Sequence, residues 1–215
     1  MDVGKLKTLR VVVPGTIILI EAYPIYASVY GKTLWQLLSS DLLITGFGSV
    51  VAYILGAIYN IFCIRAIFNG QSHKKIINNI KNRILDMGRT LPLTPERRSE
   101  LLSGNEIIDI FYALVDSNKT LTERSKLVRD NGLKWSSVAD IIVLGTFFGF
   151  LYMIIGLVLN NKLMLEFSEY SLLTIILFWF LHPIVEKKHI ALSNSQLDFI
   201  GNQLRNELIQ RVDDL

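Results

Sequence analysis

The chain has 215 residues, of which 51% are hydrophobic and only 19% are charged, and its mean hydropathy is +0.39. Soluble domains carry about 25% charged residues, so this composition excludes an ordinary soluble enzyme and a disordered chain. The formal net charge is +3, and the single cysteine, Cys63, excludes a disulfide scaffold. The apolar residues are concentrated in four runs, which indicates that part of the chain lies in a bilayer.

The first two apolar runs predict an N-terminal transmembrane hairpin over residues 1–68. The first run covers residues 11–30 and is longer than the hydrophobic part of a cleaved signal peptide, so we expect it to remain in the protein. The second covers residues 42–68 and exceeds the roughly 20 residues needed to cross a bilayer, so it must tilt or protrude. Cys63 lies in this run, where we expect it to act as a small apolar packing residue.

The other two apolar runs predict a C-terminal hairpin over residues 138–185. Its spans cover residues 138–159 and 170–185, and the second of these is short for a membrane helix. The tail that follows, residues 186–215, has apolar residues every three or four positions, which predicts an amphipathic helix.

Between the hairpins, residues 69–137 predict a helical insert without strands. One helix start is indicated at Thr94-Pro95, by a hydroxyl cap and a proline in the first turn, and a second at Asn105-Glu106, which precedes apolar residues at helical spacing. The pair Asn131-Gly132 predicts a turn directly before the third span.

Positive charge predicts the orientation of these spans. Of the 22 lysine and arginine residues, 20 lie in residues 1–10, 65–137 and 186–215, whereas the two short loops carry only Lys32 and Lys162. Because cationic segments stay on the cytoplasmic side, we expect both termini and the insert in the cytoplasm. The predicted fold is an all-α membrane protein with four transmembrane helices and a small helical cytoplasmic lobe. Its composition suggests a bacterial cell inner membrane.

Two acidic residues lie in or beside the predicted spans. Glu21 is near the middle of the first, where a charge costs roughly 2.5–3.5 kcal/mol, so it must be paired, protonated or facing water. It is either a gating residue, next to a kink at Pro24, or a packing residue bonded to a neighbouring helix through Thr45, Ser49 or Tyr53. Asp140 is expected in the first turn of the third span, where the helix dipole favours an acid.

Small residues recur at spacings that allow close approach of membrane helices. They lie on the second and third spans, and they leave open whether the partner is another helix of the chain or another subunit. Because there are two such faces, we expect a homo-oligomer. The helix-packing residues are Gly48, Ala52, Gly56, Gly145, Gly149 and Gly156.

A basic stretch follows the second span, with a net charge of +6 over residues 65–98. Such a cluster favours contact with anionic lipid headgroups or with an acidic protein partner. Because residues 69–98 carry no tyrosine or tryptophan, and no phenylalanine for base stacking, direct contact with nucleic acid is disfavoured. The candidate contact residues are Lys74, Lys75, Lys81, Arg83 and Arg89.

No catalytic or metal-binding motif is present in the sequence. We therefore expect a protein that is not an enzyme and needs no cofactor. The first functional hypothesis is an oligomeric membrane effector or channel-like protein controlled through its cytoplasmic lobe, in a plan shared with membrane-acting arms of bacterial antiphage defence. The alternative is a membrane scaffold that recruits a soluble cytoplasmic protein partner without conducting ions.

Overall fold

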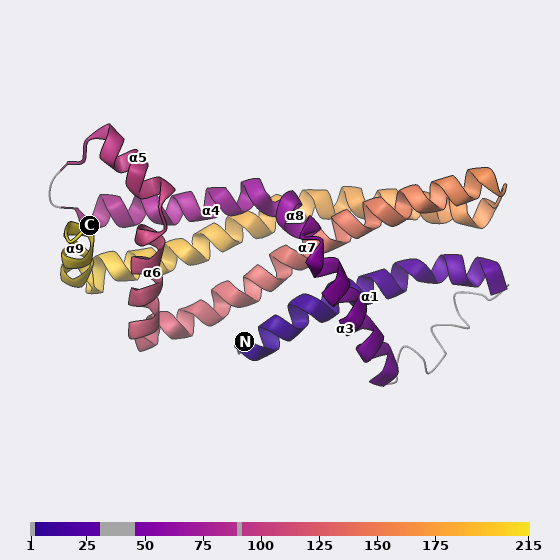
Figure 1. Cartoon of the computed structure of the whole chain (residues 1–215), viewed down its shortest axis with the longest axis horizontal. Helices are drawn as coiled ribbons and strands as arrows, with labels where there is room; N and C mark the ends of the chain where they lie inside the picture. Colours follow the sequence, from indigo (N-terminus) through magenta and orange to yellow (C-terminus); the bar gives the residue numbers. More distant parts are fainter. Residues whose placement is uncertain (1–2, 31–45, 90–91) are drawn as a thin grey trace. The chain divides into compact units, whose positions relative to one another are not determined.

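The structure, a computed structural model, describes residues 3–30, 46–89 and 92–215, and these residues form helices and no strands. The predicted all-α class is therefore confirmed for the described part of the chain. The loop over residues 31–41 and the start of the second run, residues 42–45, lie outside the described residues. The helices are α1 (Val3–Tyr30), α3 (Gly46–Ile61), α4 (Ile64–Gly88), α5 (Pro95–Ser103), α6 (Glu106–Ser117), α7 (Lys119–Val158), α8 (Lys162–Gln203) and α9 (Arg205–Asp213), as labelled in Figure 1.

Three of the described helices are long and apolar enough to cross a membrane: α1, α7 and α8. The pair α3 and α4 passes the same test only when the two helices count as one bent span. Large apolar side chains face outward on these helices, among them Phe150 (60% exposed), Leu157 (67%) and Phe180 (70%). Apolar surface of this extent is costly in water and suits lipid chains, so the chain is a membrane protein.

The second apolar run is not one continuous helix, which corrects the prediction for residues 42–68. It breaks after Ile61, and the helices on the two sides of the break differ in direction by 62°. Cys63 has a φ of 52° in the break, and its N–H donates to the Asn60 carbonyl three residues back (3.2 Å). Its side chain is exposed, so the packing role predicted for Cys63 is also wrong. Hydropathy detects the length of an apolar run but not a backbone turn within it.

One further local prediction is wrong. α7 runs without interruption through Asn131-Gly132, where a turn was predicted, because Asn131 is only 4% exposed and its amide lies 3.4 Å from the His189 ring nitrogen Nδ1. Packing of this kind overrides local turn preference. α8 runs without a break from the fourth run into the first part of the tail, as far as Gln203.

The chain divides into two compact units. Within the described part of the chain, unit 1 contains residues 70–89, 92–132 and 186–215, and unit 2 contains residues 3–30, 46–69 and 133–185. The helices α4, α7 and α8 each contribute residues to both units.

Unit 1 is a small helical domain with an apolar core. α5 begins at Pro95 as predicted, and the Thr94 hydroxyl caps it by accepting the Arg97 N–H (3.3 Å). α6 begins at Glu106, also as predicted. The fully buried apolar side chains of unit 1 come from five helices: Ile84, Ile107, Leu114, Leu121, Leu197, Ile200, Leu208 and Val212.

Candidate functional site

Glu21 lies near the middle of α1, and its partner in unit 2 is Tyr152 of α7. The Tyr152 hydroxyl lies 3.1 Å from the Glu21 carboxylate oxygen Oε2 and also contacts the Glu21 main-chain carbonyl. Tyr152 is fully buried, whereas Glu21 is half-buried. The carboxyl group is thus held by a neutral hydroxyl on a neighbouring helix.

The residues around this contact are apolar. Tyr152 forms a buried cluster with Phe148 and Met164. The α1 residues Ile18 and Ile25, on either side of Glu21 along the chain, pack against this cluster. Low polarity strengthens the hydrogen bond to the carboxyl group.

The partner of Glu21 differs from the one that the sequence suggested. Thr45 lies outside the described residues, and the carboxyl group bonds Tyr152 rather than Ser49 or Tyr53. The sequence did contain a signal for this contact, because Tyr152 lies within the third apolar run. A buried tyrosine hydroxyl requires a polar partner. Pro24 is buried in α1, which continues through it to Tyr30.

A second polar cluster in unit 2 is centred on Asp140. Its carboxylate accepts two hydrogen bonds from Arg65, from Nε at 2.6 Å and from Nη2 at 2.8 Å, and a third from the Tyr59 hydroxyl at 3.0 Å. The Asp140 side chain is 1% exposed and that of Arg65 is 17% exposed. Because α7 begins at Lys119, Asp140 lies in the helix interior, so its predicted place in a first turn is wrong.

The Asp140 cluster joins the two sides of the break between α3 and α4. Tyr59 precedes the break and Arg65 follows it, and both bond the same carboxylate. The main-chain carbonyl of Arg10 on α1 accepts further hydrogen bonds from Asn60 (3.3 Å) and from Arg65 Nη2 (3.1 Å). A bidentate arginine–carboxylate pair has a fixed planar geometry, so the cluster can hold the bend in place.

The small residues of α3 are used for packing within the chain. A Cβ atom added at Gly56 would overlap the Val11 carbonyl oxygen of α1, and one added at Gly15 would overlap the Ala52 carbonyl oxygen. The backbones of α1 and α3, which cross in Figure 1, therefore approach closely through Gly15, Ala52 and Gly56. Gly48 lies at the start of α3 and is half-buried.

The three glycines of α7 pack against α8 of the same chain. A Cβ atom at Gly145 would lie 3.4 Å from Ile175, and one at Gly149 would lie 3.1 Å from Ser171. At Gly156 it would lie 2.7 Å from a Leu165 methyl group. Both small-residue faces thus have partners within the chain, and neither requires a second subunit.

The five basic residues proposed for headgroup or partner contact have different surroundings in unit 1. Lys74 is exposed, and Lys75 is largely exposed although it pairs with Glu186. Lys81 is instead 5% exposed, and its ammonium group donates to the Leu102 and Gly104 carbonyls near the end of α5. This lysine therefore stabilises the end of a helix.

The two arginines of that set are paired within unit 1. Arg83 lies 2.6 Å from the Asp198 carboxylate, and Arg89 lies 3.8 Å from that of Asp213. Sequence spacing could not reveal these pairs, because their acidic partners lie more than a hundred residues further along the chain.

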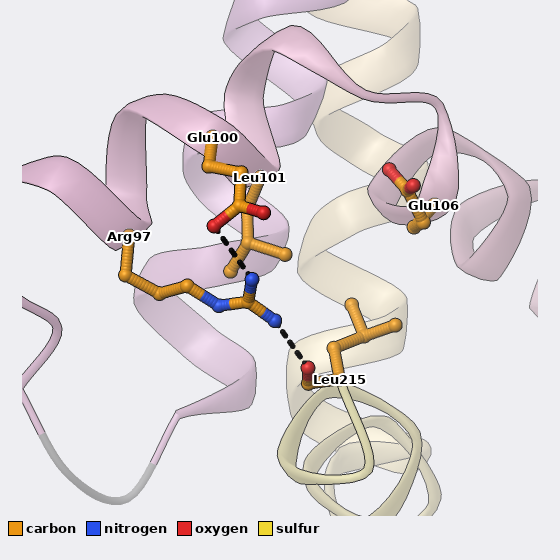
Figure 2. Close-up of a pocket in the computed structure, with 5 residues that line it drawn as sticks. All are labelled: Arg97, Glu100, Leu101, Glu106 and Leu215. Carbon is orange, nitrogen blue, oxygen red and sulfur yellow. Dashed lines mark hydrogen bonds and ion pairs between the residues drawn. The ribbon is translucent and has the colours of Figure 1, made fainter.

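Unit 1 also has a small pocket of about 230 Å³, which is shown in Figure 2. Arg97 is its cation, and the guanidinium donates to Glu100 (2.6 Å) and to the Leu215 main-chain oxygen (2.5 Å). Leu101 and Glu106 complete the lining. The arginine is already paired and a second carboxylate lies beside it, so the pocket does not suit an anionic ligand.

Comparison with protein-family models, with curated proteins and with solved structures finds no match for this chain.

Proposed function

We propose that this chain is a non-enzymatic membrane effector with channel-like activity, in which Glu21 is the gating residue. The observation that carries the proposal is the contact between the Glu21 carboxyl group and the Tyr152 hydroxyl. An ionisable group in a membrane helix is costly and marks a functional site more often than a structural one. A neutral partner leaves the charge of Glu21 free to change when water or an ion reaches it.

The contrast with Asp140 supports this assignment. Asp140 is also buried, but the guanidinium of Arg65 compensates its charge directly, as expected for a structural ion pair. Glu21 bonds a hydroxyl group, which supplies no compensating positive charge. Of these two acids, Glu21 is therefore the one whose protonation or hydration can alter the packing of α1 against α7.

The proposal includes a topology and an assembly. α3 and the first residues of α4, up to residue 69, together act as one bent span in addition to α1, α7 and α8. Unit 1 lies in the cytoplasm with both termini, and the chain resides in a bacterial inner membrane. The distribution of lysine and arginine supports this orientation. Channel-like activity requires a path, which we place between subunits of a homo-oligomer. A soluble protein partner that binds unit 1 supplies the control.

Ion flux through reconstituted protein tests the proposed role of Glu21. Glu21→Gln keeps the size of the side chain and removes its charge, so we expect flux to fall at least about tenfold, equivalent to about 1.4 kcal/mol. The matched control is Glu169→Gln, the same change at an exposed position of α8, which should conduct like the wild type. Equal flux from the wild type and Glu21→Gln would contradict the gating role.

The second candidate is a scaffold that recruits a soluble protein to the membrane and conducts nothing. The apolar packing of α1 around Glu21 favours it, because a carboxyl group bonded inside a packed cluster also serves as a structural residue. No flux from the wild type, with its partner present, would support the scaffold. A crosslinking experiment on the full chain that captures no partner at unit 1 would count against it.

The biological setting that we propose, antiphage defence, rests on the general plan of a small membrane protein with a helical lobe. Bacteria expressing the chain with its neighbouring genes should survive phage infection better than bacteria expressing Glu21→Gln. Equal survival of the two strains would remove this setting without affecting the flux experiment.

A further inference from the structure

In unit 1, α4 and α8 are joined by a series of polar contacts. Glu186 of α8 is 8% exposed and accepts hydrogen bonds from the Ser72 hydroxyl and the Lys75 ammonium group, both at 2.5 Å. Further along, the Asn79 amide donates to Asn194 at 2.8 Å. Because the residue numbers rise together on both helices, α4 and α8 run parallel here, and the Glu186 contacts fix their register.

This register places four exposed lysines at one level of the two helices. Lys74 and Lys75 belong to α4, and Lys187 and Lys188 follow Glu186 on α8. An α-helix rises 1.5 Å per residue, so the four positions lie within roughly 5 Å of one another along the helix axes. We call these four residues the lysine belt.

The lysine belt keeps most of its charge available. Glu186 pairs with Lys75, whose side chain is still 62% exposed. Within the described residues, no ion pair is formed by the other three lysines of the belt. Lys74, Lys187 and Lys188 therefore carry positive charge that no carboxylate in the described part of the chain compensates, in contrast to Arg83, which pairs with Asp198.

Apolar surface precedes the lysine belt on both helices. On α4 the side chain of Ile67 is 79% exposed, and on α8 those of Phe180 and Ile184 are 70% and 61% exposed. The apolar part of each helix favours contact with lipid acyl chains. The lysine belt follows directly along both helices, so it lies at the level of the headgroups. A membrane surface surrounds the helices that cross it, so lysines at one level can reach headgroups whichever way they point.

We propose that the lysine belt binds anionic phospholipid headgroups in the leaflet bordering unit 1. This site differs from the one that sequence spacing suggested, because it excludes Lys81, Arg83 and Arg89 and includes Lys187 and Lys188. Each lysine near such a surface contributes on the order of 1 kcal/mol, or about fivefold in lipid preference. The site does not depend on whether the protein conducts ions.

Lipid retention measured by native mass spectrometry tests the site. The full chain is placed in nanodiscs that contain phosphatidylglycerol and phosphatidylcholine in equal parts. After extraction, the molecules of each lipid that remain bound to the protein are counted. The test variant carries Lys74→Gln, Lys187→Gln and Lys188→Gln, and it keeps Lys75 because of its ion pair. The control carries Lys119→Gln, Lys126→Gln and Arg205→Gln, which removes equal charge from exposed positions of unit 1.

We expect the wild type and the control to retain phosphatidylglycerol in excess, and the test variant to lose at least about fivefold of that preference. The same loss in both variants, or no preference in the wild type, would overturn the proposal. The wild type alone gives a second measurement that does not depend on the folding of any variant. Its preference should decrease as salt is raised, and a preference independent of salt would also overturn the proposal.

Discussion

At the scale of single residues, Glu21 and Asp140 of unit 2 differ in their partners. Asp140 accepts three hydrogen bonds, two of them from a guanidinium group, and Glu21 accepts one from a tyrosine. A carboxylate that is paired and fully bonded is structural, because removing one partner leaves a buried charge that nothing compensates. The Glu21 carboxyl group is instead bonded to a neutral hydroxyl, which supplies no compensating charge.

The Arg65–Asp140 pair gives a prediction about stability. Arg65→Gln and Asp140→Asn should each lower the free energy of unfolding by about 3 kcal/mol, because each leaves the other charge buried and unpaired. The double variant should lose less than the two single losses together, with a coupling of at least about 1 kcal/mol. Unfolding in detergent micelles, followed by circular dichroism, measures these differences.

The exposed pair of Arg97 and Glu100 provides the comparison, because its side chains are 40% and 66% exposed. Arg97→Gln and Glu100→Gln should show a coupling below about 1 kcal/mol. A coupling at Arg65 and Asp140 no larger than at this surface pair would show that the Asp140 cluster does not hold the bend.

At the scale of elements, the sequence predicted the type of structure better than its boundaries. The Thr94 cap with Pro95 correctly gave the start of α5, and the helical spacing after Asn105-Glu106 gave that of α6, since those signals lie within a few neighbouring residues. The break at Cys63 was missed because its stabilising contacts come from Asp140, more than seventy residues away. The same limit applies to Glu21, whose partner Tyr152 is 131 positions further along the chain.

Packing of α1 against α3 gives a second prediction about stability. Gly56→Ala should destabilise the protein by about 1–3 kcal/mol, because the added methyl group meets the Val11 carbonyl oxygen, a main-chain atom that cannot rotate away. Gly70→Ala is the matched control, because a Cβ atom there meets nothing within 4 Å. Alanine is the better helix former, so this control should be neutral or stabilised by up to about 1 kcal/mol.

Thermal unfolding of both glycine variants in the same detergent measures the difference. If Gly56→Ala does not fold at all while Gly70→Ala does, the close approach of the two helices is still supported. Equal unfolding temperatures for the two variants would contradict it.

At the scale of the whole molecule, the account depends on the orientation of the chain in the membrane. Lysine and arginine distribution predicts that unit 1 and both termini share one side, and that the turn between α7 and α8 faces the other. Gating through Glu21 and headgroup binding at the lysine belt require that these helices cross the membrane. Control by a cytoplasmic partner also requires that unit 1 lies in the cytoplasm.

Labelling of single cysteines in intact cells tests the predicted orientation of the chain in the membrane. The native cysteine is removed by Cys63→Ser, and one new cysteine is introduced at an exposed position, by Ser99→Cys in α5, Asn206→Cys in α9 or Lys162→Cys after α7. A thiol reagent that cannot cross membranes should label Lys162→Cys in intact cells, and the other two only after permeabilisation. Labelling of Ser99→Cys in intact cells would contradict the account.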